Sequence, residues 1–578
     1  MSDIQYDIVV VGGSLGGVAA ALRAGAMGAN VCLIEATDWL GGQYTAQGVT
    51  KPDDNQYVDT VGSTAGYRAF RHAVRAYYRN NFRLSSTGAS QPEFNPGGKY
   101  PGFALEPRVG SNVLNQMLTD SSTVHLRLDT QIENVEVSGD TIISVTATDA
   151  AGTTARYLAA YFLDATDLGD LLPLCGTEGV DWVLGAESQD ATQEPAAPPA
   201  PRRDWIQPIT VPFALEHRPA GENHTIPQPA NYDQLKAQQS YTILDGYIKG
   251  MFTPGADMWS YRQFIASKNF ADPAFPYDLT MINTGGNDYE QGTLPTGSVD
   301  GNAAVIAAAR QASLGYLYWL QTECPRDDHP TRKGYPELKL RVDLFGTTDG
   351  TAAQPYIRES RRIKALKTIV QQDLDVGFNA GPRAKLFSDS CGIGHYGMDV
   401  HALTSAGMPN SFVDTMPYQI PVSALIPVRL TNLLAACKNL GVTHITNGAY
   451  RLHPIEWNIG ESAGALAAFC VSNNVAPQNV PVTADLLSSY QHTLLDAGIP
   501  LFWWTDITTD NPIFAAIHML GVNGIFSGYQ DMTFRPNNLL SSSDRHFVEG
   551  AVGHSLDWPS STLTRGQAAL WLAQTLHL

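Results

Sequence analysis

Two apolar runs with a segment of small residues between them occupy the first 35 positions of the chain. The run 6–11 (YDIVVV) is typical of a buried strand and is followed directly by a glycine-rich segment, Gly12–Gly17. Residues 18–27 are mainly small helix formers, and a second strand-like run, 30–34, ends before Glu35. The order strand, glycine turn, helix, strand and acid predicts a βαβ unit that binds a dinucleotide.

Each residue type in this unit has a physical role. Gly12 permits the tight turn, and Gly17 lets the helix pack close to the strand. The helix begins near Ser14 and Leu15, and its free N–H groups and positive dipole end favour a diphosphate. Ser14 replaces the middle glycine of the usual pattern, but it is small and its hydroxyl can donate a hydrogen bond, while the Glu35 carboxylate can accept hydrogen bonds from a ribose. The alternative is an α/β unit whose glycine-rich turn has no ligand.

A second glycine pattern, GIGHYG at residues 392–397, is not expected to bind a nucleotide. The preceding residues 384–390 make a poor buried strand, and residues 398–402 do not have the pattern of a small-residue helix. The chain is therefore expected to hold one dinucleotide.

Four further segments along the chain have recognisable patterns. They are the Gly41-Gly42 pair that closely follows Glu35, FLDATDLGD at 162–170, YIRESRR at 356–362 and the run 447–464. In the second of these segments, Asp167 stands at the usual glycine. Over about residues 5–505, the sequence resembles the bacterial FAD-dependent oxidoreductase family, whose FAD fold is of the glutathione-reductase type.

The resemblance implies an α/β fold class with three parts. These are a Rossmann-like FAD-binding domain of the glutathione-reductase type at 1–202 and 380–500, a mixed α+β substrate region at 203–379, and a small helical module at 504–578. It also implies a three-stranded insertion before the chain returns to the parallel sheet. Strand patterns at 123–128, 132–137 and 141–146 are assigned to this insertion, and the buried run 158–163 to the return.

The implied cofactor is FAD, and its expected contacts lie in both halves of the chain. The N-terminal set is Gly12, Ser14, Leu15, Gly17, Glu35, Gly42, Gln43, Thr45, Ile132 and Asp167. A helix with a glycine-rich start is expected to approach the flavin ring through Gly460, Ala463 and Gly464, where its dipole would stabilise the reduced flavin. The alternative role of these small residues is close helix packing.

A flavin that oxidises an alcohol or amine needs a base, and five residues are candidates. His444 and His453 precede the proposed flavin helix and are favoured for the substrate side of the ring, and His395 lies between glycines. Asp399 and His401 would share one face of a strand, where the carboxylate can orient the imidazole. The alternative for this last pair is a structural role.

Other charged residues near these candidates carry expectations of their own. A carboxylate at Glu456 would repel a reduced flavin unless it is turned away, protonated or paired with Arg451. Arg358, Arg361 and Arg362 are expected mainly to join segments through salt bridges, with an anionic substrate as the alternative.

Composition narrows the class of protein. The 578 residues carry a net charge of −19 at pH 7, which argues against nucleic acid and anionic membrane surfaces as partners. Apolar residues make up 43% of the chain, but no apolar run approaches the roughly 20 residues needed to span a bilayer. No export signal is visible, and six scattered cysteines without a CxxC pair indicate reduced thiols in a cytoplasmic protein without a metal site.

The tail differs from the rest of the chain. Segments at 504–507, 512–520, 524–529, 533–538 and 563–569 follow one another as in a single S-layer-homology module, with an insertion before the last helix. Such modules usually occur in threes in exported proteins. A single copy without an export signal is interpreted as a packing or dimerisation appendage that would form a homo-oligomer, rather than as a wall anchor.

The leading hypothesis is a flavin dehydrogenase or oxidase that moves a hydride from a CH–OH or CH–NH group of a small molecule to flavin N5. One nucleotide fold and no CxxC pair near the flavin segment disfavour a disulfide-reductase mechanism. Two alternatives stay open: a flavin monooxygenase reduced by NAD(P)H or a partner protein, and a non-catalytic FAD-containing binding protein.

Overall fold

A five-stranded parallel sheet forms the centre of the computed structural model, which describes residues 2–98, 102–239, 241–244 and 248–578. β2 and β3 are buried along their whole length, which explains why both are continuous apolar runs. Neighbouring strands pair in parallel throughout, and β21 brings a distant part of the chain into the sheet. The strand order is β21 (Leu433–Ala435), β8 (Tyr161–Asp164), β2 (Ile8–Val11), β3 (Val31–Ile34) and β4 (Val124–Arg127).

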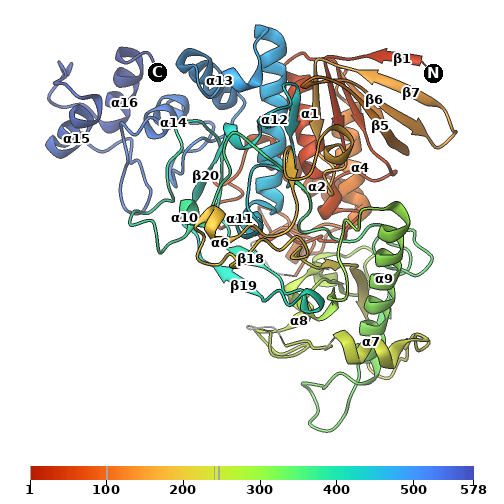
Figure 1. The fold of residues 1–578 in the computed structure, drawn as a ribbon. Coiled ribbons are helices and arrows are strands. Elements are labelled where there is room, and N and C mark those ends of the chain that lie inside the picture. Colours follow the sequence, from red (N-terminus) through yellow and green to blue (C-terminus); the bar gives the residue numbers. More distant parts are fainter. Residues whose placement is uncertain (1, 99–101, 240, 245–247) are drawn as a thin grey trace.

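A second sheet lies beside the N-terminus (Figure 1). It corrects the expected three-stranded insertion, because the predicted strand 123–128 is β4, the edge of the parallel sheet. The predicted run 158–163 divides between β7 and β8, since a short apolar run does not reveal which sheet it joins. The order of this second sheet is β1 (Ser2–Gln5), β7 (Thr154–Leu158), β6 (Thr141–Asp149) and β5 (Thr130–Ser138).

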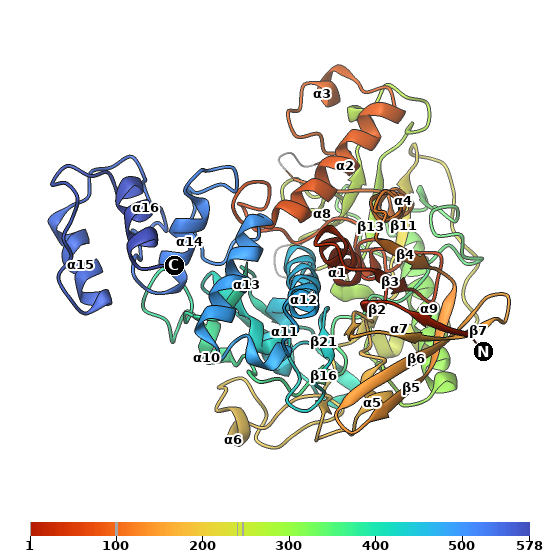
Figure 2. The same cartoon turned by 90° about the horizontal axis from the view of Figure 1, so that it is seen from above.

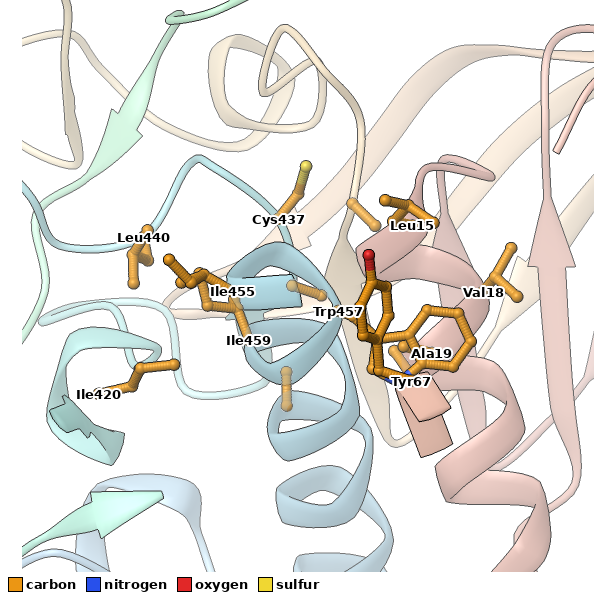
Figure 3. Close-up of a cluster of buried hydrophobic side chains, with 14 of the residues drawn as sticks. Leu15, Val18, Ala19, Tyr67, Ile420, Cys437, Leu440, Ile455, Trp457 and Ile459 are labelled. Atoms are coloured by element: carbon orange, nitrogen blue, oxygen red, sulfur yellow. The ribbon is translucent and has the colours of Figure 1, made fainter. Parts of the chain in front are cut away.

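Two helices from opposite halves of the chain, α1 (Leu15–Ala26) and α12 (His453–Asn473), lie side by side (Figure 1). A Cβ atom built at Gly460 would lie 2.0 Å from Gly16 O, and one at Gly464 would lie 2.2 Å from Ala20 O. The helices therefore touch backbone to backbone, which requires residues without a side chain at these positions. Apolar side chains of both helices pack around this contact (Figure 3).

The position of α12 differs from the expectation for the flavin helix. The helix begins at His453 after the N-cap Leu452, about two turns before Gly460. Gly460 and Gly464 face α1, and Ala463 is fully buried in the same helix. These small residues thus have the alternative role, close helix packing.

Residues 203–379 contribute an antiparallel sheet and a long helix, α9 (Val299–Thr322), at the opposite end of the view from the second sheet (Figure 1). In a separate strand pair, β10 and β14, Asp288 of β14 lines a cavity of about 550 Å³. The four-stranded sheet has the order β12 (Gln263–Ile265), β13 (Leu279–Ile282), β11 (Phe213–His217) and β15 (Leu338–Leu340), and the pair is β10 (Ile209–Thr210) with β14 (Asp288–Tyr289).

The second glycine pattern lies in β17 (Ser390–Gly394), which pairs antiparallel with β20 (Tyr418–Pro421). The chain then enters β18 (Met398–Val400), paired with β19 (Ser411–Val413), and no helix follows the glycines. This segment therefore lacks the strand, turn and helix order of a nucleotide-binding turn.

The tail, residues 504–578, forms one end of the molecule (Figure 2) and contains α14 (Phe514–Val522), α15 (Ser542–Val552) and α16 (Arg565–Thr575). α13 (Ala484–Asp496) precedes the tail and packs against α12 and α14. Arg383 joins the tail to the body: its Nη1 donates to Ser527 O at 3.1 Å, and the guanidinium lies 4.8 Å from the Trp504 ring centre. Burial lowers the pKa of Arg383 to about 10. The resemblance of the tail to an S-layer-homology module stays a prediction.

The remaining elements connect these layers. Within the described residues, no helix combines the length and the hydropathy needed to cross a bilayer. All six cysteines are buried and unpaired. The connecting elements are α2 (Ala65–Asn81), α3 (Ser86–Ala89), α4 (Pro107–Thr119), α5 (Leu172–Cys175), α6 (Gln189–Thr192), α7 (Tyr232–Gln239), α8 (Met258–Tyr261), α10 (Gln371–Leu374), α11 (His444–Tyr450), β9 (Trp182–Val183) and β16 (Arg362–Ile363).

The substitution Gly460→Ala tests the backbone contact between α1 and α12. The added methyl group would lie 2.0 Å from Gly16 O, so the helices must move apart. We expect the free energy of unfolding to fall by about 1–3 kcal/mol, the usual cost of overpacking a core. The measurement is denaturant unfolding of the purified protein followed by circular dichroism.

The matched control is Gly550→Ala in α15, where the added methyl group has no atom within 4 Å. Alanine is the better helix former, so this change should leave stability unchanged or raise it by up to about 1 kcal/mol. A Gly460→Ala protein as stable as the control would contradict the contact.

Candidate functional site

The glycine-rich turn between β2 and α1 forms the floor of a cavity. Gly12 has a φ of +102°, and a Cβ atom there would lie 2.5 Å from the carbonyl carbon of Ala165. A Cβ atom at Gly17 would lie 1.9 Å from Gly12 O, so helix and strand can approach this closely only with glycine at that position. Ser14 caps α1, since its Oγ accepts a hydrogen bond from Gly17 N at 3.2 Å.

This turn cavity has a volume of about 210 Å³. Glu35 lies in its wall, where Oε2 accepts a hydrogen bond from Gly13 N at 2.7 Å and Oε1 accepts one from Thr37 Oγ1 at 2.7 Å. Burial raises the pKa of Glu35, although these hydrogen bonds act in the opposite direction. Five of the expected cofactor contacts line the turn cavity: Gly12, Ser14, Glu35, Ile132 and Asp167.

Gly42 and Asp167 meet beside the same turn. A Cβ atom at Gly42 would lie 3.2 Å from Ser14 Cα and 3.5 Å from Asp167 Oδ2. Asp167 is paired with the buried Lys438, whose Nζ lies 2.5 Å from Oδ1. Burial acts to lower the pKa of Lys438, but Asp167 and Glu456 outweigh it and raise the pKa. The negative charge of Asp167, which replaces the glycine usual at this position of the family pattern, is thus balanced by Lys438 from the other half of the chain.

Five expected contacts of the N-terminal set are buried and do not line the turn cavity: Leu15, Gly17, Gly42, Gln43 and Thr45. Gln43 Nε2 donates to Arg451 O at 2.9 Å, and Thr45 Oγ1 donates to Leu40 O at 2.5 Å. The side chains of Gln43 and Thr45 thus bind backbone carbonyls and position the loop that follows the Gly41-Gly42 pair.

Glu456, in the first turn of α12, faces the N-terminus of α1. Its Oε1 accepts a hydrogen bond from Gly16 N at 3.3 Å. Burial raises the pKa of Glu456, against the opposing charge of Lys438. Of the arrangements that the sequence left open, pairing with Arg451 is wrong, because Arg451 Nη2 lies 3.1 Å from Asp399 Oδ2 instead.

A second cavity, of about 550 Å³, lies against β14, β18 and β19. We call it the polar cavity because its wall contains eight charged side chains. They are Asp53, Arg262, Asp288, Glu290, Arg358, Asp399, His401 and Arg451.

The start of the YIRESRR segment runs between the two cavities. Gln354, Pro355 and Ile357 line the turn cavity, whereas Tyr356 and Arg358 line the polar cavity. From Pro355 to Arg358 this is the alternation of an extended chain, whose successive side chains point to opposite faces. One segment therefore contributes to both cavities.

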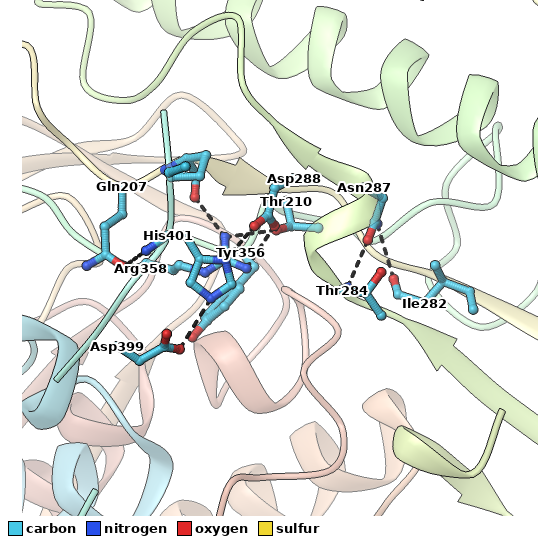
Figure 4. A network of polar contacts seen from close by, with 12 residues as sticks. Gln207, Thr210, Ile282, Thr284, Asn287, Asp288, Tyr356, Arg358, Asp399 and His401 are labelled. Atoms are coloured by element: carbon cyan, nitrogen blue, oxygen red, sulfur yellow. Dashed lines mark hydrogen bonds and ion pairs between the residues drawn. The ribbon is translucent and has the colours of Figure 1, made fainter. Parts of the chain in front are cut away.

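His401 lies in the wall of the polar cavity between two carboxylates (Figure 4). Its Nδ1 is 2.6 Å from Asp288 Oδ2, and its Nε2 is 3.3 Å from Asp399 Oδ2. The predicted pair of Asp399 and His401 is therefore brought together, but the closer carboxylate belongs to Asp288, which the sequence did not indicate. Asp288 also accepts a hydrogen bond from Arg358 Nη2 at 2.8 Å.

The surroundings of His401, Asp288 and Asp399 favour the charged form of each side chain. Burial and Arg358 act to lower the pKa of His401, but the carboxylates of Asp288 and Asp399 outweigh them and raise it. Burial acts to raise the pKa of Asp288, but Arg358 and His401 outweigh it and lower the pKa to about 2. The pKa of Asp399 is also lowered, since His401 and Arg451 outweigh its burial.

The other three histidine candidates do not line the polar cavity. His444 Nδ1 lies 2.8 Å from Glu359 Oε2 in a buried network, and His453 Nε2 donates to Val49 O at 3.1 Å. Burial lowers the pKa of His453 to about 3, so this imidazole is neutral near pH 7. Burial also lowers the pKa of His395, whose ring lies 6.0 Å from that of Trp503.

Two arginines of YIRESRR join segments, which confirms the expectation for them. Arg361 Nη1 lies 3.3 Å from Asp170 Oδ1, and Arg362 Nη2 lies 2.8 Å from Glu187 Oε1, so each salt bridge reaches another segment of the chain. Arg358 also holds the fold through Pro208 O at 2.7 Å, but it lines the polar cavity as well.

Sequence reasoning missed several residues of the polar cavity. Asp288 and the Asp53–Arg262 pair stand in no recognised pattern, and each contact joins distant segments. Tyr356 alone had a signal, because it opens the YIRESRR segment. Among the described residues, no group of three or more His, Cys, Asp or Glu side chains is arranged to hold a metal ion.

Comparison with known families decides the class of the protein. A model of the family "FAD dependent oxidoreductase" matches residues 7–494, from β2 to α13. The chain belongs to this family. It is an FAD-dependent oxidoreductase with a Rossmann-like FAD-binding fold, and FAD is its cofactor. The turn cavity fits the group, because its floor is backbone and its wall carries the carboxylate of Glu35.

Solved structures of flavoenzymes are more distant from this FAD-dependent oxidoreductase. An L-proline dehydrogenase from P. horikoshii has 15% identity over 33% of this chain and 26% of its own, with a TM-score of 0.17. A p-nitrophenol 4-monooxygenase from Pseudomonas putida has 12% identity over 64% and 70%, with a TM-score of 0.27. A geranylgeranyl bacteriochlorophyll reductase-like protein from Thermoplasma acidophilum has 10% identity over 99% and 97%, with a TM-score of 0.31. No curated protein matches the chain.

The chain thus spans about a quarter of the proline dehydrogenase that it matches. None of these similarities indicates a substrate.

Replacement of Asp288 tests the electrostatics of His401. In Asp288→Asn the imidazolium loses its closest negative neighbour, at 2.6 Å, while burial and Arg358 remain. The pKa of His401 should therefore fall, by about one unit or more. The measurement is a pH titration of histidine ring signals by NMR, with His401→Gln to assign the resonance.

Asp399→Asn provides the comparison, because Asp399 lies 3.3 Å from the other ring nitrogen. It should lower the pKa of His401 by less than Asp288→Asn does. An unchanged His401 titration in Asp288→Asn would show that the pair does not set this pKa.

Proposed function

We propose that this FAD-dependent oxidoreductase is a dehydrogenase or oxidase that takes a hydride from a CH–OH or CH–NH group of a small organic molecule. When bound, FAD supplies the hydride acceptor, N5 of its ring. The observation that carries the proposal is the Asp288–His401 pair in the wall of the polar cavity, since such an oxidation also needs a group that takes a proton.

We propose that the turn cavity holds the ADP part of FAD. The N-terminus of α1, with Ser14 and Leu15, would bind the diphosphate through backbone N–H groups and the helix dipole. Glu35 would accept hydrogen bonds from the ribose, and Ile132 lies in the same wall. Asp167 adds a negative charge close to the diphosphate, and Lys438 balances it.

His401 is the proposed base. Its Nδ1 is held by Asp288 at 2.6 Å, so a substrate hydroxyl or amine in the polar cavity would meet Nε2, in place of the longer 3.3 Å contact with Asp399. Before the substrate binds, the surroundings favour the protonated, imidazolium form of His401. The ring must therefore lose the proton on Nε2 before it can accept a proton from the substrate. The rate of oxidation should therefore rise with pH through the pKa of His401.

The proposal also includes the domain organisation, the location and the role of the tail. We propose that the chain consists of a discontinuous FAD domain of the glutathione-reductase type (1–202 and 380–500), a substrate region (203–379) and a tail (504–578). Six buried, unpaired cysteines support a cytoplasmic location, where thiols stay reduced. The S-layer-homology-like tail is proposed as a packing or dimerisation unit, supported by the exposed apolar side chains of Leu539, Phe547 and Leu570.

Lys438→Met tests whether this cation permits the diphosphate to bind. The variant leaves Asp167 without its cation at the wall of the turn cavity. We expect the Kd for FAD to rise at least about tenfold, equivalent to roughly 1.4 kcal/mol. The measurement is titration of flavin-depleted protein into FAD, followed by quenching of flavin fluorescence.

The double variant Lys438→Met/Asp167→Asn removes both charges and should recover most of the lost affinity. Riboflavin has no diphosphate, so its binding should change less in Lys438→Met. If the double variant binds FAD as weakly as Lys438→Met, charge balance is not the role of Lys438.

The oxidation itself is tested by anaerobic mixing of the holoprotein with alcohols, amines and hydroxy acids. A substrate should bleach the flavin absorbance without NADPH, faster as pH rises through the pKa of His401. His401→Gln should slow bleaching by about 10²- to 10⁴-fold, the usual contribution of a general base. Asp288→Asn should move the midpoint of the pH profile to lower pH.

The control for this experiment is His546→Gln, an exposed histidine on α15, which should bleach at the wild-type rate. Bleaching by NADPH alone would favour the monooxygenase alternative and reject the proposal. A flavin inert to every compound would favour the non-catalytic alternative.

A further inference from the structure

Ion pairs within the wall of the polar cavity neutralise its charges. Arg262 pairs with Asp53 at 2.9 Å, and Arg358 pairs with Asp288 at 2.8 Å. All four residues line the polar cavity. Each guanidinium therefore already has its carboxylate partner before any ligand binds.

The other cationic side chains of the polar cavity are also paired with groups of opposite charge. Arg451 pairs with Asp399 at 3.1 Å, and His401 lies between Asp399 and Asp288 (Figure 4). Glu290 accepts a hydrogen bond from Thr404 Oγ1 at 2.5 Å, and as a carboxylate it gives the wall four acidic groups against three guanidiniums and His401. Among the described lining residues, every arginine and the histidine thus has a carboxylate partner.

This balance selects against charged ligands. A carboxylate or phosphate would have to displace an aspartate from a guanidinium, and a protonated amine would have to draw an aspartate away from its cation. Breaking a buried ion pair leaves an uncompensated charge, which is strongly unfavourable. A neutral ligand leaves the three arginine–aspartate pairs intact.

The same wall offers many groups to hydroxyls. Paired carboxylates keep lone pairs that can accept further hydrogen bonds. Tyr356 Oη accepts a hydrogen bond from Arg451 Nη1 at 2.7 Å, so its own hydrogen can be donated to a ligand. Asn283 Oδ1 is buried with no hydrogen-bond partner in the described chain. The rings of Tyr396 and Phe412 add apolar faces against which C–H groups can pack.

We propose that the polar cavity binds a neutral polyhydroxylated molecule, a sugar or polyol, and presents one of its secondary alcohols to His401. The inference rests on the proposed function, since it names the class of CH–OH donor. The alcohol would become a carbonyl: FAD, when bound, would supply the hydride acceptor, and the hydroxyl proton would pass to His401 in its neutral form and then to water. The cavity volume of about 550 Å³ is within the usual range for small-molecule sites.

The test is calorimetric titration of the oxidised holoprotein under anaerobic conditions. The probes are neutral hexoses, hexitols and inositols, compared with glucuronate and glucosamine. At least one neutral compound should bind about tenfold or more tightly than both charged ones. Asp53→Asn frees the charge of Arg262 and should shift the affinity ratio toward glucuronate by about tenfold.

Asp343→Asn is the matched control, because it breaks an arginine–aspartate pair with Arg341 outside the polar cavity and should leave the ratio unchanged. Preferred binding of glucuronate or glucosamine, or no binding of any neutral compound, would overturn the inference. Neutral compounds that bind without bleaching the flavin would support the ligand class and reject the proposed oxidation. A charged compound that binds best and bleaches the flavin would do the reverse.

Discussion

Backbone contact between α1 and α12 is the constraint on which the site depends. Gly460 leaves no room for a side chain against Gly16, so the two helices lie in fixed register. That register places Glu456 against the first turn of α1, where it accepts a hydrogen bond from Gly16 N. Lys438, which follows β21 in the same half of the chain, reaches Asp167 at the turn cavity. A helix contact made of glycines thus brings the second half of the chain to the glycine-rich turn of the first.

Charge balance is the second principle of the site. A buried charge without a partner is strongly unfavourable. In both cavities, buried charges are therefore paired with opposite charges from distant segments of the chain. Lys438 balances Asp167 at the turn cavity, and Arg358 with His401 balances Asp288 at the polar cavity. These pairs position the side chains, and they also decide which ligand charges the cavities tolerate.

The sequence was sufficient where the physical signal is local. Gly12, Gly17 and Glu35 lie in one short unit, and the close approach at Gly17 and the turn at Gly12 follow directly from the residue types. Strand membership was less clear: the run 123–128, assigned to the insertion, became β4 of the parallel sheet, and the run 158–163 spans the end of β7 and most of β8. The start of α12 was misplaced toward Gly460, although Pro454 in the first turn is a common helix-start residue.

Contacts between distant residues were beyond the sequence. Asp288 and His401 lie 113 positions apart, and nothing in the local pattern around Asp288 marks it as the partner of an imidazole. Asp399 was found because it stands two positions from His401, yet it proved to be the more distant carboxylate. Proximity along the chain therefore identified the candidate base but not the residue that orients it.

The central claim, one FAD per chain bound at the β2–α1 turn, is tested most directly by the flavin that the purified protein releases on heat denaturation. Chromatography of the released flavin should give FAD at one equivalent per chain, and a Gly13→Val protein, whose side chain would meet Leu40 and Glu35 in the cavity floor, should release little or none. Release of FMN, release of no flavin by the wild-type protein, or a full equivalent of FAD from Gly13→Val would contradict the account.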